Sequence, residues 1–313
     1  MVIEVENLTK MYDEEVAVDN ISFSVNRGEI FCIIGPNGSG KTSTIECIEG
    51  LRPVDAGSIN VLGLDPFKDR KKMYEQIGVQ IQEHVFVSEA KVDELCKLYS
   101  SFYTNPVPYK SLLKEFELYD SRNIHAVNLS GGQKKKLSFI LALLPRPKIV
   151  FLDEITSFLD PASRKDMLSY IRQLKGMGIT TIHITHHMDE AQALSDRICL
   201  MKDGKILSID TASNMIEKSN LPGLITFESD DEKISIESLK SIPFVISAEQ
   251  MGSKYSIRGK EGKTLRSVID YLRDNDISYS RFYDRPPNLE DVYLDIMGYD
   301  APEIKEGAKI WIE

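Results

Sequence analysis

The sequence has no surplus of basic charge and no long apolar run, and each absence excludes a class of protein. Its 313 residues include 38 Lys and Arg against 48 Asp and Glu, a formal net charge of −10. This balance argues against nucleic-acid binding, which usually requires a basic surface. The most apolar stretches, 29–35 and 137–144, are far shorter than the ~20 residues that span a bilayer. The opening residues, MVIEVENLTK, also lack the basic and apolar regions of a signal peptide, so we expect neither a membrane span nor a leader.

Cysteine is scarce, with four residues that form no Cys-x-x-Cys pair and have no neighbouring histidine: Cys32, Cys47, Cys96 and Cys199. This spacing argues against a zinc site or a disulfide framework. We therefore expect reduced, partly buried thiols in a cytosolic protein. The contents of 42% hydrophobic and 27% charged residues are those of a globular chain, and the length favours two domains.

Short apolar runs alternate with longer amphipathic stretches in the first two thirds of the chain. The runs are rich in β-branched and aromatic residues, as buried strands are, and the longer stretches have helical spacing. This alternation predicts an α/β domain with a mostly parallel core sheet. Asp203-Gly204, between apolar runs, predicts a tight hairpin. The expected strands cover 29–34, 149–152 and 180–185, and the expected helices cover 42–49, 88–103, 130–144 and 161–177.

A break at residues 219–223, SNLPG, separates an expected first domain, 1–220, from a second, 221–313. Strand signals are weakest between residues 74 and 144, so we expect a helical insertion at about 86–145. The second domain has the order strand, helix, strand, strand, helix, strand, followed by a helix at 289–296. The first six elements are typical of a small α+β (ferredoxin-like) domain. No catalytic or metal-binding constellation is found in this domain.

The sharpest motif is Gly35-Pro36-Asn37-Gly38-Ser39-Gly40-Lys41-Thr42, a full match to G-x-x-x-x-G-K-[ST]. It follows an expected strand and opens an expected helix, which is the context that phosphate binding requires. Glycines let backbone amides approach phosphate oxygens, and the helix N-terminus adds a positive dipole. Lys41 can place its charge on the β- and γ-phosphates, Thr42 can offer its hydroxyl to Mg²⁺, and Ser43 extends the nucleotide-binding segment. The alternative is an ordinary glycine-rich turn with a surface lysine.

Two carboxylates end the apolar run at 149–152. Asp153 is suited to hold the hydration shell of Mg²⁺, and Glu154 is suited to take a proton from an attacking water. Such a pair also occurs as simple solvation of a strand end. The phosphate loop in the same domain favours the catalytic interpretation.

The string Leu129-Ser130-Gly131-Gly132-Gln133 precedes a helix that begins with three lysines. Ser130 is a good N-cap, and the two glycines leave backbone amides free to approach an anion. A bare Ser-Gly-Gly would more simply be a capped helix start, but the five-residue string is more specific.

The phosphate loop, the LSGGQ string and the Asp-Glu strand, in this order, resemble an ATP-binding cassette (ABC) transporter ATPase subunit over residues 1–220. The resemblance implies a P-loop NTPase fold with ATP and Mg²⁺ as ligands. It implies that Tyr12 stacks on adenine and that Gln82 senses Mg²⁺ and couples to the membrane partner. It also places Asp160 in a loop that crosses a dimer interface, and makes His186 a switch near the γ-phosphate. Residues 130–133 would bind the ATP of the partner protomer.

Two positions leave alternatives open, and two others depart from the family pattern. Gln80 competes with Gln82, and His187 competes with His186. The family commonly has DEPTSGLDP where this chain has DEITSFLDP. Ile155 therefore replaces a proline, and Phe158 adds bulk close to the expected dimer interface. These departures keep open a regulatory nucleotide binder that does not hydrolyse ATP.

The end of the chain adds a direction of transport. Residues 287–294, PNLEDVYL, resemble the SLEDVFL-type ending of the ABC branch that exports drugs, antibiotics or lipids, although any amphipathic helix has similar spacing. The resemblance implies a separate transmembrane permease, a dimer with a second copy or a paralogous ATPase chain, and a position on the cytoplasmic face of the membrane. An importer subunit remains the alternative. A soluble ABC ATPase acting on nucleic acid would need a coiled-coil insertion, a second cassette or a basic patch, and the sequence has none of these.

Overall fold

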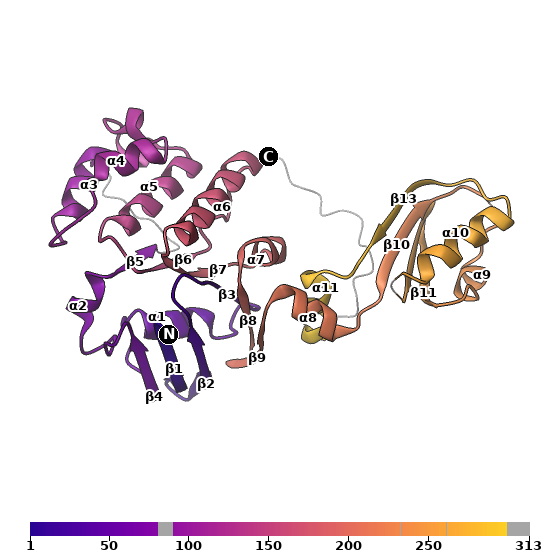
Figure 1. Ribbon diagram of the computed structural model, residues 1–313, viewed down its shortest axis with the longest axis horizontal. Coiled ribbons are helices and arrows are strands. Elements are labelled where there is room, and N and C mark those ends of the chain that lie inside the picture. The colour runs from indigo at the N-terminus through magenta and orange to yellow at the C-terminus, as the bar shows by residue number, and fades with distance from the viewer. Residues whose placement is uncertain (81–89, 232, 261, 299–313) are drawn as a thin grey trace. The chain divides into compact units, whose positions relative to one another are not determined.

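The computed structural model describes residues 1–80, 90–231, 233–260 and 262–298 (Figure 1). The chain forms two compact units, residues 1–212 and the residues from Ser213 onward. The sequence places this boundary after residue 220. In the structure, helix α8 (Ala212–Ser219) lies almost entirely in the second unit.

A six-stranded sheet forms the centre of the first unit. Its strand order is β5-β6-β7-β3-β8-β9, with the first five strands parallel and β9 antiparallel to β8. The predicted mostly parallel sheet is confirmed, and Asp203 and Gly204 form the predicted hairpin turn. The strands are β3 (Ile30–Ile34), β5 (Ile77–Gln80), β6 (Ile149–Asp153), β7 (Thr180–Ile184), β8 (Arg197–Lys202) and β9 (Lys205–Asp210).

Both faces of this sheet are covered, because successive side chains of a strand point to opposite sides. In β6, Val150 and Leu152 pack into an apolar cluster with the helices on one face. Ile149 and Phe151 pack into a second cluster on the other face. A strand buried on both faces needs an unbroken apolar run. This is why β3 and β6 are recognisable in the sequence.

Helices cover the first of these faces (Figure 1). The described part of the expected helical insertion, residues 90–145, contains helices and two 3-10 turns and no strand. Strand β5, just before it, was not predicted, because Ile-Gly-Val-Gln is too short to stand out. The elements of the insertion are α3 (Val92–Ser100), α4 (Tyr109–Glu115), the 3-10 turns Tyr119–Ser121 and Ala126–Asn128, and α5 (Gly131–Leu143). Helices α6 (Pro161–Gly176) and α7 (Met188–Leu194) follow later in the chain and pack on the same face.

A second, three-stranded antiparallel sheet packs on the opposite face together with helix α1. Its order is β2-β1-β4, and the sequence analysis predicted none of its strands. Most of their outward-facing residues are polar and their pairing is interrupted by bulges, so they form no continuous apolar run. The elements are β1 (Ile3–Tyr12), β2 (Glu15–Val25), α1 (Lys41–Ile48), β4 (Ala56–Val61) and α2 (Arg70–Tyr74).

The second unit contains four antiparallel strands in the order β11-β12-β10-β13, with helices α9 and α10 in the connections β10–β11 and β12–β13. Leu239 and Leu272 of the helices share an apolar cluster with Phe227 and Ile257 of the sheet. The element order is the one that the sequence predicts: β10 (Gly223–Glu228), α9 (Ile236–Lys240), β11 (Val245–Met251), β12 (Lys254–Gly259), α10 (Thr264–Asp274), β13 (Ser280–Arg285) and α11 (Leu289–Met297). Across the described ranges of both units, no helix combines the length and apolar character needed to cross a membrane.

Candidate functional site

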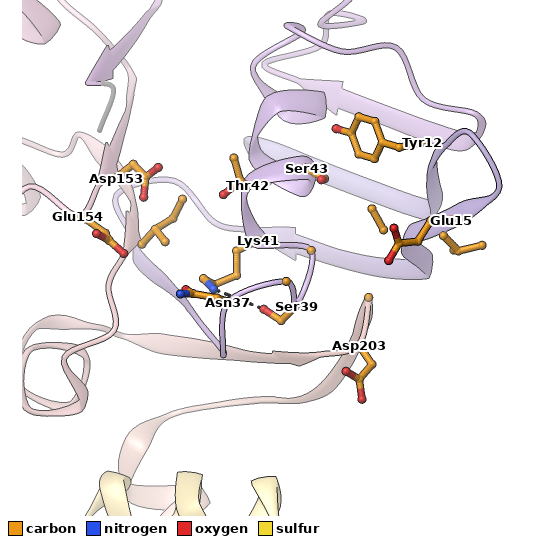
Figure 2. A pocket seen from close by; sticks show the side chains of 16 residues that line it. Tyr12, Glu15, Asn37, Ser39, Lys41, Thr42, Ser43, Asp153, Glu154 and Asp203 are labelled. Carbon is orange, nitrogen blue, oxygen red and sulfur yellow. Dashed lines mark hydrogen bonds between the residues drawn. The ribbon is translucent and has the colours of Figure 1, made fainter. Parts of the chain in front are cut away.

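Three loops meet at one edge of the central sheet. They follow β6, β7 and β3, which are parallel neighbours, so their carboxyl ends lie together. A cavity of about 580 Å³ opens at this edge (Figure 2). It is lined by residues 37–43 of the phosphate loop, by Asp153 at the end of β6 and Glu154 directly after it, and by Ile184 of β7. The remaining lining residues are Tyr12, Glu15, Val16, Ala17, Asp203 and Gly204.

The backbone of the phosphate loop is packed so closely that two of its glycines are required. Gly40 has a φ of 92°, and a Cβ there would lie 2.4 Å from the carbonyl oxygen of Ala17. A Cβ on Gly35 would lie 2.3 Å from the carbonyl oxygen of Met201. The sequence analysis did not assign residues 15–17 or 203–204 to the site. The folded chain reveals that they belong to it, because the loop packs on Ala17 and Gly204 through backbone atoms and all five residues line the same cavity.

Lys41 lies folded against its own loop, where its Nζ donates to two loop carbonyl oxygens at 2.9 and 2.8 Å. Burial lowers the pKa of this ammonium, and the carboxylates of Glu154 and Asp153 oppose the shift. Burial also raises the pKa of Asp153, and the neighbouring Glu154 adds to that effect. An ammonium, the hydroxyl of Thr42 in the first turn of α1 and a carboxylate around one cavity fit a triphosphate with a divalent cation.

Gln80 is buried at the end of β5, and its Oε1 accepts a hydrogen bond from the backbone N–H of Asp153 at 3.1 Å. This contact fixes the strand end that carries Asp153. Gln82, which the resemblance assigns to the Mg²⁺-sensing and coupling role, lies outside the described residues.

Glu154 and His186 are in contact, with 3.3 Å between Oε1 and Nδ1. The hydroxyl of Ser157 donates to the other carboxylate oxygen at 3.4 Å, and Nζ of Lys135 donates to the Glu154 carbonyl oxygen at 3.0 Å. The sequence analysis did not single out Lys135, because it is the middle residue of three consecutive lysines. His187, the competing histidine, packs its ring 4.1 Å from that of His186. Of the two histidines, His186 makes the contact with Glu154.

The LSGGQ segment caps helix α5 and stands apart from the cavity. Ser130 Oγ accepts from the Gln133 N–H at 3.2 Å, and Gln133 Oε1 accepts from the Ser130 N–H at 3.0 Å. None of the residues 129–133 lines the cavity that the described residues form. Asp160 caps α6 by accepting from the N–H groups of Ala162 and Ser163, both at 3.1 Å. It is not among the lining residues either.

Tyr12 lines the cavity at the end of β1, with Nζ of Lys10 and the guanidinium carbon of Arg52 each 5.5 Å from its ring centroid. The two family departures are placed very differently. Ile155 is fully buried, whereas Phe158 is fully exposed with a φ of 63°.

Comparison with known proteins shows consistent similarities. The ABC transporter family model matches residues 18–157. The chain is 32% identical over 301 residues to the Nod factor export ATP-binding protein I of Rhizobium etli, and this alignment covers 95% of this chain and 93% of that protein. It is 28% identical over 305 residues to the linearmycin resistance ATP-binding protein LnrL of Bacillus subtilis, covering 95% and 98%. The dimeric structure of MJ0796, a bacterial ABC transporter cassette, matches with a TM-score of 0.60 and 25% identity, covering 67% of this chain and 98% of that one.

Proposed function

The chain belongs to the ABC transporter family, and we propose that it is the ATP-hydrolysing subunit that powers export of a drug, antibiotic, lipid or similar substrate through a separate transmembrane subunit. The observation that carries the proposal is the cavity at the sheet edge. The phosphate loop, Asp153 and Glu154 all line it, and His186 contacts Glu154. The family is one of ATPases, so ATP is the nucleotide that the cavity binds.

The proposed binding roles follow from the chemistry of the lining residues. The side chain of Lys41 and the backbone amides of residues 37–43 bind the triphosphate, with Lys41 leaving its carbonyl partners to do so. Tyr12 stacks on adenine. Thr42 and Asp153 hold Mg²⁺ together with Gln82, and the bound ion neutralises phosphate charge.

The proposed hydrolytic step is an in-line attack of water on the γ-phosphorus, which breaks its bond to the oxygen that bridges the β- and γ-phosphates and releases ADP. Positioning and electrostatics dominate the catalysis. Glu154 accepts the proton of the attacking water. His186, 3.3 Å from its carboxylate, orients Glu154 and faces the γ-phosphate. Ser157 and Lys135 hold the same residue by one oxygen each, so Glu154 is restrained at its side chain and at its backbone.

The composite site proposed here is a head-to-tail dimer. Residues 129–133 do not line the cavity of their own chain, which supports a role in the partner's site. In such a dimer Ser130–Gln133 of one protomer bind the γ-phosphate held by the other, and Asp160 lies at the interface. The relative MJ0796 is dimeric. The partner of this chain is a second copy or a paralogous ATPase chain.

Export as the direction of transport is supported by the relatives, which are named for Nod factor export and for linearmycin resistance. Both similarities extend over 95% of this chain and therefore include the second unit. We class that unit as ferredoxin-like, supported by its strand order and antiparallel pairing. We assign residues 1–220 to the nucleotide-binding domain and residues 221–313 to an accessory domain. The subunit works at the cytoplasmic face of the membrane, held there by the transmembrane subunit.

The direct test is steady-state ATP hydrolysis by the purified chain, alone and with a multi-span membrane protein, sought first in the reading frames that neighbour its gene. Lys41→Ala should abolish nucleotide binding measured by calorimetry. Lys148→Ala is the matched control, because that lysine is exposed and does not line the cavity. Equal ATP affinity in wild type and Lys41→Ala would remove the assignment of the site. Failure of the membrane protein to co-purify or to stimulate hydrolysis would remove the transport role and leave the ATPase.

A further inference from the structure

Glu190 is a buried carboxylate in α7 that receives three side-chain hydrogen bonds. Its side chain is 0% exposed. Nε of Arg164 donates to Oε1 at 2.5 Å. The hydroxyls of Thr156 and Thr185 both donate to Oε2, at 2.7 and 3.1 Å. Burial alone would raise the pKa of Glu190, but the neighbouring His183, the Thr156 hydroxyl and the Arg164 guanidinium lower it to about 2, so the carboxylate is ionised.

The two threonines connect Glu190 to the loops that carry the proposed catalytic pair. Thr156 lies two residues after Glu154, and Thr185 immediately precedes His186. The hydroxyl of Thr185 also accepts a hydrogen bond from the backbone N–H of His187 at 3.0 Å, which fixes the turn after β7. One carboxylate oxygen therefore links the loop after β6 to the loop after β7.

We propose that Glu190 is a positioning residue for ATP hydrolysis, because its Oε2, through Thr156 and Thr185, holds the loops of Glu154 and His186 at the spacing that keeps these two side chains in contact. The inference rests on the roles given to Glu154 and His186 in the proposed function.

The chemistry of the carboxylate explains why this residue type is required. A carboxylate is an acceptor at both oxygens, so it can receive two hydroxyls on one and the arginine on the other. A glutamine at position 190 could offer its oxygen to the threonines only by turning its NH₂ toward Arg164, which is itself a donor. The reverse orientation would break the present pattern at both threonines.

The test compares Glu190→Gln, Thr156→Val and Thr185→Val in the full chain with the matched control Glu29→Gln. Glu29 is also a buried glutamate bound by an arginine, with Nε and Nη2 of Arg197 at 2.6 and 3.0 Å, but it does not line the cavity. All variants are assayed at a temperature at which melting curves show each to be folded.

We expect kcat to fall by about 10- to 100-fold in Glu190→Gln, because misplacement of reacting groups by about 1 Å costs up to about 100-fold. The Kd for ATP–Mg²⁺ should stay within about twofold of wild type. Each valine variant should show part of the loss in kcat. The control Glu29→Gln should melt earlier than wild type yet keep its kcat. This split separates positioning from a merely structural ion pair.

A second measurement does not depend on turnover. In ¹⁵N spectra of histidine-labelled, nucleotide-free protein, the His186 signal, assigned by its loss in His186→Gln, should shift in Glu190→Gln and Thr185→Val but not in Glu29→Gln. The proposal is overturned by a wild-type kcat in Glu190→Gln. It is equally overturned by full kcat in both valine variants, or by unshifted His186 signals. If the wild type hydrolyses no ATP, or Glu154→Gln hydrolyses it as fast, the proposed function fails instead, and the spectra still decide whether Glu190 positions His186.

Discussion

Replacement of Phe158 by glycine should stabilise the first unit, although it removes a large apolar side chain. Phe158 is 103% exposed, so its ring buries no area on folding and the truncation forfeits no hydrophobic stabilisation. Its φ of 63° lies in the left-handed region. For a residue with a Cβ this conformation costs roughly 1–2 kcal/mol, and glycine adopts it without that cost.

The gain is reduced by the unfolded state, because glycine loses more conformational entropy on folding, roughly 0.5–1 kcal/mol. The difference between these two ranges is about 0–1.5 kcal/mol, so the expected net stabilisation is its midpoint, about 0.75 kcal/mol. For a unit of 212 residues this midpoint corresponds to a rise in Tm of about 1.5–3 °C. The relevant transition in a melting curve is the one that ATP–Mg²⁺ shifts upward, since ligand binding stabilises the unit that binds it.

Phe158→Ala is the control for this prediction. Alanine removes the ring but keeps the Cβ, so it should retain most of the left-handed cost and melt close to wild type. A glycine variant that melts no higher than the alanine variant would show that the backbone at this position carries no strain, or that the ring makes stabilising contacts in solution.

Three further predictions concern the site itself. Glu154→Gln should lower hydrolysis by about 10²–10⁴-fold while ATP still binds, and the ATP-bound dimer should accumulate in light scattering; wild-type turnover would exclude Glu154 from the chemistry. Mixing Ser130→Arg protein with Lys41→Ala protein should restore at most one of the two composite sites in an ATPase assay, and no recovery in a demonstrated mixed dimer would contradict the composite site. Asp153→Asn should raise the Tm at pH 7. The pKa of Asp153 is higher in the folded state than in the unfolded state, so the folded protein loses stability as the pH rises from the unfolded pKa through the folded pKa, and asparagine avoids this loss. This advantage should shrink in melts at lower pH, and an advantage independent of pH would contradict the raised pKa.

The sequence predicted those parts of the fold that local pattern determines. Strands β3 and β6 are apolar on both faces, and the phosphate loop is a contiguous motif between a strand and a helix, so both are recognisable in the sequence. The sheet β2-β1-β4 was missed because its strands are mostly polar on one side and interrupted by bulges, and because the pairing of β1 with β4 joins residues far apart in the chain. Strand β5 was missed because four residues carry little periodic signal.

The candidate site divides in the same way between residues that a motif names and residues that only the folded chain reveals. Lys41, Asp153 and Glu154 follow from contiguous strings. The hydrogen bond from Lys135 to Glu154 and the bond from Thr156 to Glu190 join residues 19 and 34 positions apart. No periodicity in the sequence marks such pairs.

The family departures after Glu154 illustrate the consequence for mechanism. On sequence alone, the change from proline to Ile155 suggests a less constrained turn and a misplaced glutamate. In the structure Ile155 is fully buried, and the turn is restrained by Lys135 at the Glu154 carbonyl oxygen and by Glu190 at Thr156. Tertiary contacts can thus supply the restraint that a proline ring would otherwise provide. The departure at Ile155 therefore does not by itself argue for a protein that binds ATP without hydrolysing it.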